Sequence, residues 1–203
     1  MKPLLGLFLL ATAASLPGFA QSSKFDYYLL TLSWSPEYCH GHTSTTQCAS
    51  DKHFGFVVHG LWPEYKTGSG PQHCGIQPGL SNPSTMLDIM PDLGLIQHEW
   101  TTHGTCSGLT ADQYFGSIRK AFNTIRQPSE LTAAKTQQDL SPLQIKQAFV
   151  RANPNLNASE IIINCAGNYL QAVEICLTKG LQPMACPAPR DCRASSIRVP
   201  PVH

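Results

Sequence analysis

The sequence predicts an α+β fold, and two observations carry that prediction. Strand-like segments lie toward both ends of the chain, at 25–36 and 54–63 and again at 160–164 and 168–177. Segments with helical periodicity lie between them, and this order is typical of a sheet with helices packed against it.

The two N-terminal strands are predicted from composition. Residues 25–36, FDYYLLTLSWSP, are rich in aromatic, apolar and β-branched side chains and end at a proline. Residues 54–63, FGFVVHGLWP, have the same character. With a period of two, Val57, His59 and Leu61 are expected to share one face of the second strand.

The helices are predicted from periodicity and capping. Helical periodicity begins near Pro83 and returns before Gly104, which we expect to cap the C-terminus of that helix. A second helix begins with a capping box formed by Thr110 and Gln113. A third has Ser141 as its N-cap, a proline at the first helical position and another proline where it stops.

The first twenty residues have the features of a secretory signal peptide. Lys2 precedes a short run of Leu, Phe and Ala, and the small residues Gly18 and Ala20 precede the expected cut. The alternative, a buried N-terminal helix, is less consistent with that pattern, and the run is too short to span a membrane. We therefore expect a signal peptide at 1–20, a single domain at 21–203, a secreted or periplasmic location and no membrane partner.

The cysteines indicate disulfides. All eight follow the expected cut, and an even number behind a secretion signal is typical of a bridged protein. Eight cysteines allow roughly 105 pairings, so the number alone fixes none of them. The tail from Gln182 is rich in proline and cysteine, and we expect it to be irregular.

The charge balance limits how this chain can bind nucleic acid. Without Lys2, basic and acidic side chains are equal in number. A neutral protein does not hold nucleic acid along a long stretch of phosphate backbone. Any nucleic-acid partner must therefore be held locally, in a cleft.

The segment HEWTTHGTC, 98–106, differs by one residue from the zinc-protease pattern. Zinc binding on a helix requires two histidines four residues apart, but His98 and His103 are five apart. At that spacing the two rings diverge by roughly 140° around the helix. A zinc hydrolase remains an alternative that treatment with a chelator would expose, but the spacing predicts no metal site.

The same segment places a carboxylate near an imidazole. Glu99 and His103 are four residues apart, so they are separated by roughly 40° on a helix and are expected to lie side by side. A carboxylate beside an imidazole favours the charged ring and raises its pKa, as in many acid–base sites. An ion pair on the helix surface beside a buried histidine is the alternative.

His59 supplies a possible second imidazole. It lies among apolar residues of a predicted strand, where it is either a satisfied core residue or part of a site. Two facing imidazoles suit transesterification of RNA, because one removes the 2′-OH proton while the other protonates the departing 5′ oxygen. That chemistry requires no metal and no serine nucleophile.

Two segments resemble the ribonuclease T2 family, in particular its bacterial periplasmic branch. They are FVVHGLWPE, 56–64, and HEWTTHGTC, 98–106. The resemblance implies an α+β fold with a central, mostly antiparallel sheet packed with helices and stapled by disulfides. It also implies a monomeric, metal-independent endoribonuclease without a cofactor, which cleaves single-stranded RNA with low base specificity through a 2′,3′-cyclic phosphate to 3′-phosphate ends.

The resemblance assigns catalytic roles residue by residue. His59 would be the general acid and His103 the general base. Glu99 would support charge in the site and polarise the phosphate, and His98 would bind phosphate.

The resemblance also implies a base-binding group. Trp62 would stack on a base, which is physically reasonable because every base has a π-face. Glu64 would help to hold that base, with Tyr65 as a further candidate. The alternative for Trp62 is a place in the core.

The family pattern also pairs the cysteines. The implied bridges are Cys39–Cys48, Cys74–Cys106, Cys165–Cys192 and Cys176–Cys186.

One residue departs from the family pattern. The family usually has a lysine just before the second histidine, where this chain has Thr102. A lysine would stabilise charge on the phosphorane, whereas threonine offers only a hydrogen bond. We expect reduced or retuned activity, and the rival interpretation is a weakly active or inactive family member that binds RNA or a protein.

Overall fold

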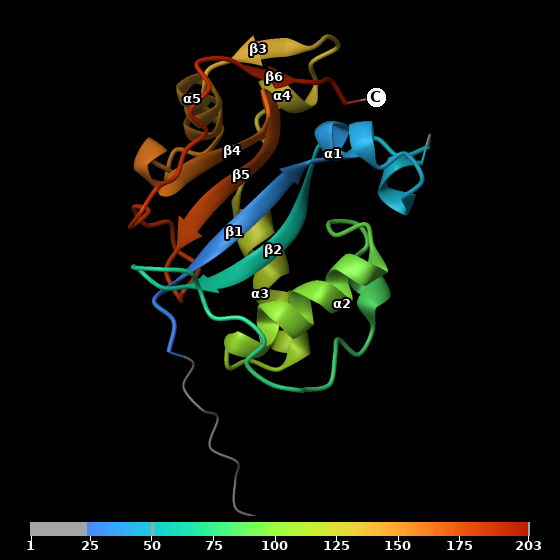
Figure 1. Ribbon diagram of the computed structural model, residues 1–203, viewed down its shortest axis with the longest axis vertical. Coiled ribbons are helices and arrows are strands. Elements are labelled where there is room, and N and C mark those ends of the chain that lie inside the picture. Colours follow the sequence, from blue (N-terminus) through green and yellow to red (C-terminus); the bar gives the residue numbers. More distant parts are fainter. Residues whose placement is uncertain (1–23, 50, 203) are drawn as a thin grey trace, which may run out of the picture.

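The computed structural model describes residues 24–49 and 51–202, and the predicted signal peptide at 1–20 lies outside these ranges. Within them a single six-stranded sheet forms the centre of the molecule (Figure 1). Its strands are β1 (Tyr27–Trp34), β2 (Phe56–Glu64), β3 (Gln138–Leu140), β4 (Ile161–Ala166), β5 (Tyr169–Leu177) and β6 (Ile197–Val199).

The sheet is mostly antiparallel, as predicted. β1 lies between β2 and β5, and β4 pairs with β5 in a further antiparallel ladder. β6 joins β5 in parallel through a single pair, Tyr169 with Arg198, and β3 pairs antiparallel with β6. The tail predicted to be irregular therefore contains one short strand, which neither its proline content nor its cysteines indicate.

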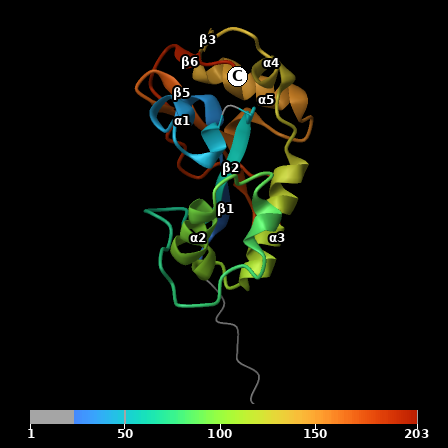
Figure 2. The ribbon, with the colours of Figure 1, turned by 90° about the vertical axis from the view of Figure 1, so that its right-hand side faces the viewer.

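Helices cover the sheet and its edge. They are α1 (Ser35–Gly41), α2 (Leu93–Thr102), α3 (Ala111–Thr124), α4 (Ser129–Thr132) and α5 (Pro142–Ala152), with 3-10 turns at Thr46–Cys48, Pro83–Met86, Gly104–Cys106 and Ala158–Glu160. In Figure 2, α2 and α3 lie on either side of β1 and β2. The capping boxes that predicted α3 and α5 are both present.

The first predicted strand is shorter than expected, because a helix follows it directly. β1 ends at Trp34, and α1 begins at Ser35 with Pro36 in its first turn. Proline fits there because backbone N–H groups in the first turn have no partner within the helix. Pro36 therefore lies at the start of a helix and not at the end of the predicted strand.

A β-bulge in β2 makes the side chains after it face the opposite way from the prediction. Thr31 pairs with Gly60 and Leu32 with Val58, so His59 is an extra residue in β2. An extra residue turns the following side chains to the opposite face. Leu61 therefore joins Val58 in the main core, whereas His59 lies outside that core. The prediction that His59 and Leu61 share a face was wrong because it assumed an uninterrupted period of two.

The cysteines form the pairs that the family resemblance implied, and every described cysteine is bridged. Cys74–Cys106 joins the loop after β2 to the turn after α2 and thus connects the two segments that carry the motif histidines. The other bridges are Cys39–Cys48, Cys165–Cys192 and Cys176–Cys186.

Candidate active site

Helix α2 is held firmly at both ends. At its N-terminus, the Asp92 carboxylate accepts a hydrogen bond of 2.7 Å from the Leu95 N–H. At its C-terminus, the N–H of His103 donates to the carbonyl of Glu99, and the chain continues into the turn that Cys106 anchors. Glu99 is thus fixed within the last turn of the helix, and His103 is its C-cap residue.

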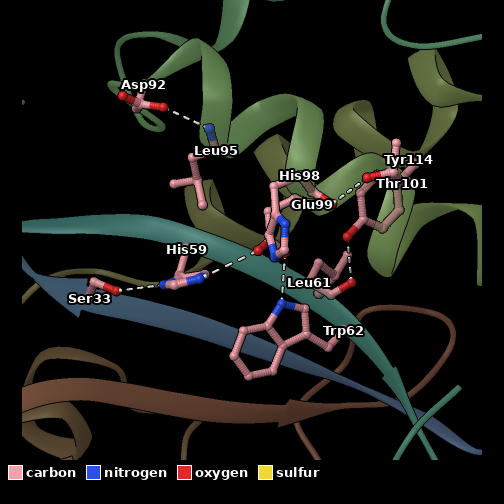
Figure 3. A network of polar contacts seen from close by, with 10 residues as sticks. All are labelled: Ser33, His59, Leu61, Trp62, Asp92, Leu95, His98, Glu99, Thr101 and Tyr114. Carbon is pink, nitrogen blue, oxygen red and sulfur yellow. Dashed lines mark hydrogen bonds and ion pairs between the residues drawn. The ribbon is translucent and has the colours of Figure 1, made fainter. Parts of the chain in front are cut away.

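Glu99 is the centre of a contact network between α2 and β2 (Figure 3). The Trp62 indole N–H donates a hydrogen bond of 2.7 Å to Glu99 Oε2. Glu99 Oε1 lies 3.4 Å from His59 Nε2, and the other ring nitrogen of His59 lies 3.3 Å from the Ser33 hydroxyl. The carboxyl group therefore connects the strand histidine with the strand tryptophan.

Gly60 makes this approach possible. A Cβ atom at residue 60 would overlap the Glu99 carboxylate and the Trp62 indole nitrogen. The glycine between the two functional side chains of β2 is therefore needed for space, since α2 packs its carboxylate directly over the strand backbone.

The imidazole that Glu99 approaches is His59, and the predicted pairing with His103 was wrong. The His103 ring stacks on Trp62, with ring centroids 5.0 Å apart and planes 26° apart, while His59 meets the same indole edge-on at 5.5 Å. His103 lies outside the regular helix, with ψ of −45° but φ of −115°, so the helical angle between positions 99 and 103 does not apply to it. Trp62 therefore lies between the two histidines.

The pKa values in this network follow from burial. Glu99 is fully buried, and desolvation raises its pKa to about 8 although the Trp62 hydrogen bond opposes the rise. Partial burial and the nearby His98 lower the pKa of His59. Burial, together with His98, His59 and His73, lowers the pKa of His103 to about 4. The expectation that a carboxylate raises the pKa of His103 was therefore wrong.

At neutral pH these shifts predict a proton on Glu99 and neutral rings at both histidines. A protonated carboxyl carries no charge, which explains why Glu99 does not raise the pKa of the adjacent His59. Glu99 Oε1 also has no hydrogen-bond partner among the described residues. The site thus offers two neutral bases and one unengaged carboxyl oxygen.

His98 lies at the solvent side of the same helix. Its side chain is exposed, and it lines a cavity of about 280 Å³ that also borders His59, Asp92 and Leu95. This position is consistent with contact to an anion that approaches His59 from solvent.

Thr102 supplies no replacement for a lysine side chain. It is 5% exposed, and its hydroxyl has no hydrogen-bond partner among the described residues. Its carbonyl accepts a hydrogen bond of 2.8 Å from the N–H of His73. The threonine thus positions the loop that carries His73, and its hydroxyl is directed into the protein.

Of the three residues predicted to hold a base, Trp62 borders a cavity beside a candidate catalytic histidine. Trp62 lines a cavity of about 400 Å³ beside His59. Glu64 is half-buried, and its carboxylate accepts a hydrogen bond from the N–H of Gly70 in the following loop. Tyr65 packs against the main core. The structure therefore places Trp62 against both histidines, and Glu64 near the cavity residue Glu174.

The floor of that cavity contains residues that sequence reasoning missed. Thr31, Asn164 and Glu174 come from β1, β4 and β5 and line the same cavity as Trp62. One signal could have indicated Glu174, because it is an ionisable residue inside an apolar strand, as His59 is.

Within residues 24–49 and 51–202, no group of three or more His, Cys, Asp or Glu side chains is arranged to hold a metal ion. None of the helices in the described part of the chain is long and apolar enough to cross a membrane.

Comparisons with known proteins place these residues in a wider group. A sequence model of the ribonuclease T2 family matches residues 25–186. The chain is 34% identical over 151 residues to "Probable ribonuclease" of Haemophilus influenzae, which covers 64% of this chain and 55% of that protein. It is 39% identical over 98 residues to "Ribonuclease" of Aeromonas hydrophila, covering 46% of this chain and 43% of that one. The chain thus spans about half the length of these curated relatives.

The fold has solved counterparts as well. The structure of "RNase-related protein from Calystegia sepium" matches with a TM-score of 0.67 and 23% identity, over 87% of this chain and 97% of that one. This likeness confirms the predicted fold class.

Proposed function

Because this chain belongs to the ribonuclease T2 family, we propose that it is a metal-independent endoribonuclease that cleaves single-stranded RNA with low base specificity. The observation that carries the proposal is the arrangement of two imidazoles, His59 and His103, on either side of Trp62, with the buried Glu99 beside His59. That arrangement suits a reaction in which one proton is removed while another is delivered.

In the first step, His103 acts as the general base. Its pKa of about 4 leaves it unprotonated over most of the pH range, so it can accept the 2′-OH proton. The 2′ oxygen then attacks phosphorus, the bond from phosphorus to the 5′ oxygen breaks, and His59 in its protonated form gives its proton to that oxygen. The products are a 2′,3′-cyclic phosphate and a free 5′-OH.

Glu99 is suited to polarise the phosphate. Because its pKa is raised to about 8, it is protonated at neutral pH and can donate a hydrogen bond from Oε1 to a phosphoryl oxygen. Donors fixed where negative charge develops are a large source of rate acceleration. His98, exposed beside His59, contributes a further contact to the phosphate.

In the second step, the histidines exchange roles. His59, now neutral, removes a proton from water, and the resulting hydroxide attacks phosphorus. The bond from phosphorus to the 2′ oxygen breaks, and His103 gives its proton to that oxygen. The product is a 3′-phosphate end.

The proposal extends to location and assembly. We propose that residues 1–20 are a signal peptide, that 21–203 form a single domain and that the protein is a secreted or periplasmic monomer. Four disulfides support this proposal, because such bonds persist in oxidising compartments.

The test is cleavage of single-stranded RNA in excess EDTA, with the products separated by chromatography. We expect wild type to release 2′,3′-cyclic ends, and His59→Ala and His103→Ala each to lose a factor of about 10²–10⁴ in kcat/KM. His40→Ala is the matched control, since His40 is exposed on α1 and borders neither cavity beside His59. It should retain full activity.

Two results would contradict the proposal. Activity that EDTA abolishes would indicate a metal-dependent hydrolase. Folded, disulfide-intact wild type that binds RNA but does not turn it over would indicate that Thr102 has converted the scaffold into a binding protein.

A further inference from the structure

The cavity beside His59 and Trp62 has a polar floor that the two histidine motifs do not include. Its volume is about 400 Å³, within the range of roughly 300–1,000 Å³ that is typical of small-ligand sites. It adjoins the candidate catalytic residues directly, since His59 and Trp62 form one of its walls. A group that occupies the cavity therefore lies beside the position of the scissile phosphate.

The floor is formed across three neighbouring strands. Thr31 of β1 is paired with Glu174 of β5, and the β4 residue Asn164 is paired with the adjacent Ala172 of β5. Glu174 is only 8% exposed, and the Asn164 side chain hydrogen-bonds its carboxyl group. A hydroxyl, an amide and a carboxyl group thus lie together at fixed positions on the sheet.

One of these groups is only weakly satisfied. The Thr31 side chain is 3% exposed, and its hydroxyl lies close enough to the Glu174 carboxyl group to lower the pKa of Glu174, but it has no hydrogen bond of regular geometry within the described residues. A poorly satisfied buried hydroxyl is costly, and such groups in native proteins commonly bond to a ligand or water. This hydroxyl lines the same cavity as Glu174.

Two aromatic side chains also line the cavity. Tyr38 of α1 is stacked on His42, the residue that follows α1, with ring centroids 4.2 Å apart and planes 3° apart. Both side chains line the cavity. Aromatic rings together with donors and acceptors in one cavity match the two recognition features of a nucleobase, its π-face and its hydrogen-bonding edge.

We propose that this cavity holds the base of a nucleotide joined to the scissile phosphate, and that Glu174 and Asn164 determine which base is preferred. The inference rests on the proposed ribonuclease function. It adds the sheet floor to the predicted base-binding group, and Glu64 of that group lies near enough to Glu174 to raise its pKa.

The Glu174 carboxyl group can act as both a hydrogen-bond donor and an acceptor toward a base. Burial raises the pKa of Glu174 to about 7, and the nearby Glu64 adds to the rise while Asn164 opposes it. A protonated carboxyl both donates and accepts, as the amide of Asn164 does. Such pairs can match the adjacent donor and acceptor atoms of a base edge, which produces a preference rather than absolute specificity.

The experiment measures kcat/KM for the sixteen dinucleoside monophosphates with wild type, Glu174→Leu and Asn164→Ala. We expect wild type to prefer certain bases at one of the two positions, and each variant to reduce that ratio about fivefold or more. The dinucleotides that wild type cleaves most slowly should be cleaved by each variant at rates within about twofold of wild type. Asn164 is half-buried, so Asn164→Ala remains informative even where Glu174→Leu folds poorly.

Glu160→Gln is the matched control. Glu160 is also 8% exposed, but it caps the turn at Ala158–Glu160 and does not line the cavity. It should leave all ratios unchanged.

A second measurement separates failure of this inference from failure of the proposed function. Calorimetric titration with the four nucleoside 3′-monophosphates does not depend on turnover. Base-dependent binding that Glu174→Leu and Asn164→Ala both remove would support the inference, even in a chain without activity. Wild-type cleavage with base ratios that neither variant alters would overturn the inference and leave the proposed function intact.

Discussion

Two buried glutamates lie near His59, one in contact with it and one lining the same cavity, and they share chemistry but not partners. Glu99 of α2 is fully buried, with its pKa raised to about 8, and it contacts His59 and Trp62. Glu174 of β5 is 8% exposed, with its pKa raised to about 7, and it contacts Asn164 on the cavity floor.

The difference indicates that partners, not burial, separate the proposed catalytic carboxyl group from the proposed recognition carboxyl group. Desolvation is the largest cause of both shifts, so both groups hold a proton more tightly than an exposed glutamate. Glu99 adjoins the group that must transfer a proton. Glu174 adjoins an amide and a hydroxyl that transfer none, so its proton serves hydrogen bonding alone.

Replacing each glutamate with glutamine separates the two roles most strongly. Glu99→Gln keeps the acceptor for the Trp62 indole but changes the donor to the phosphate, and we expect a loss of about 10²–10³ in kcat/KM. The preference among bases should not change. Glu174→Gln retains a donor and an acceptor, and its overall rate should stay within about tenfold of wild type. The measurement is steady-state cleavage of the dinucleoside monophosphates at a single pH, and equal rate losses in both variants would break the comparison.

Stability against pH gives a smaller effect with a definite sign. A carboxyl whose folded pKa exceeds its unfolded value of 4.5 contributes stability below pH 4.5, and this contribution is lost as pH rises through the folded pKa. The loss extends to about pH 8 for Glu99 and about pH 7 for Glu174. Glutamine does not titrate, so each variant should gain stability relative to wild type as pH rises.

The size of that gain should rank the two sites. One pKa unit corresponds to about 1.4 kcal/mol, so Glu99→Gln should gain more than Glu174→Gln between pH 5 and pH 9. Urea unfolding at pH 5, 7 and 9 measures the difference in the free energy of unfolding. A constant offset between variant and wild type at all three pH values would show that neither pKa is raised.

Much of the fold was predictable because its signals are local. The capping boxes at Thr110 and Ser141 and the apolar strands determine helices and strands from neighbouring residues alone. The strands β3 and β6 were missed because each has three residues, and their pairing partners are distant in sequence.

For the candidate site, the sequence predicts residues that the structure brings together, but not the contacts between them. His59, Glu99 and His103 were identified by motif, but the spacing of four residues paired Glu99 with the wrong histidine. The bulge at His59 arises from the pairing of β2 with β1, and no period within β2 reveals it. Glu174 becomes part of a site only because the sheet brings β5 beside β1 and β4, which the sequence of β5 does not show.

The pH dependence of kcat/KM for wild type tests the central assignment most directly, because it reports the pKa values of the acid and the base in the free enzyme. The account requires His103 without its proton and His59 with its proton. We predict a bell-shaped profile. As pH rises, kcat/KM should increase near pH 4, where His103 deprotonates. It should then decrease at a pH lower than 6.5, where His59, with its lowered pKa, loses its proton. An activity maximum at or above pH 7 would contradict it.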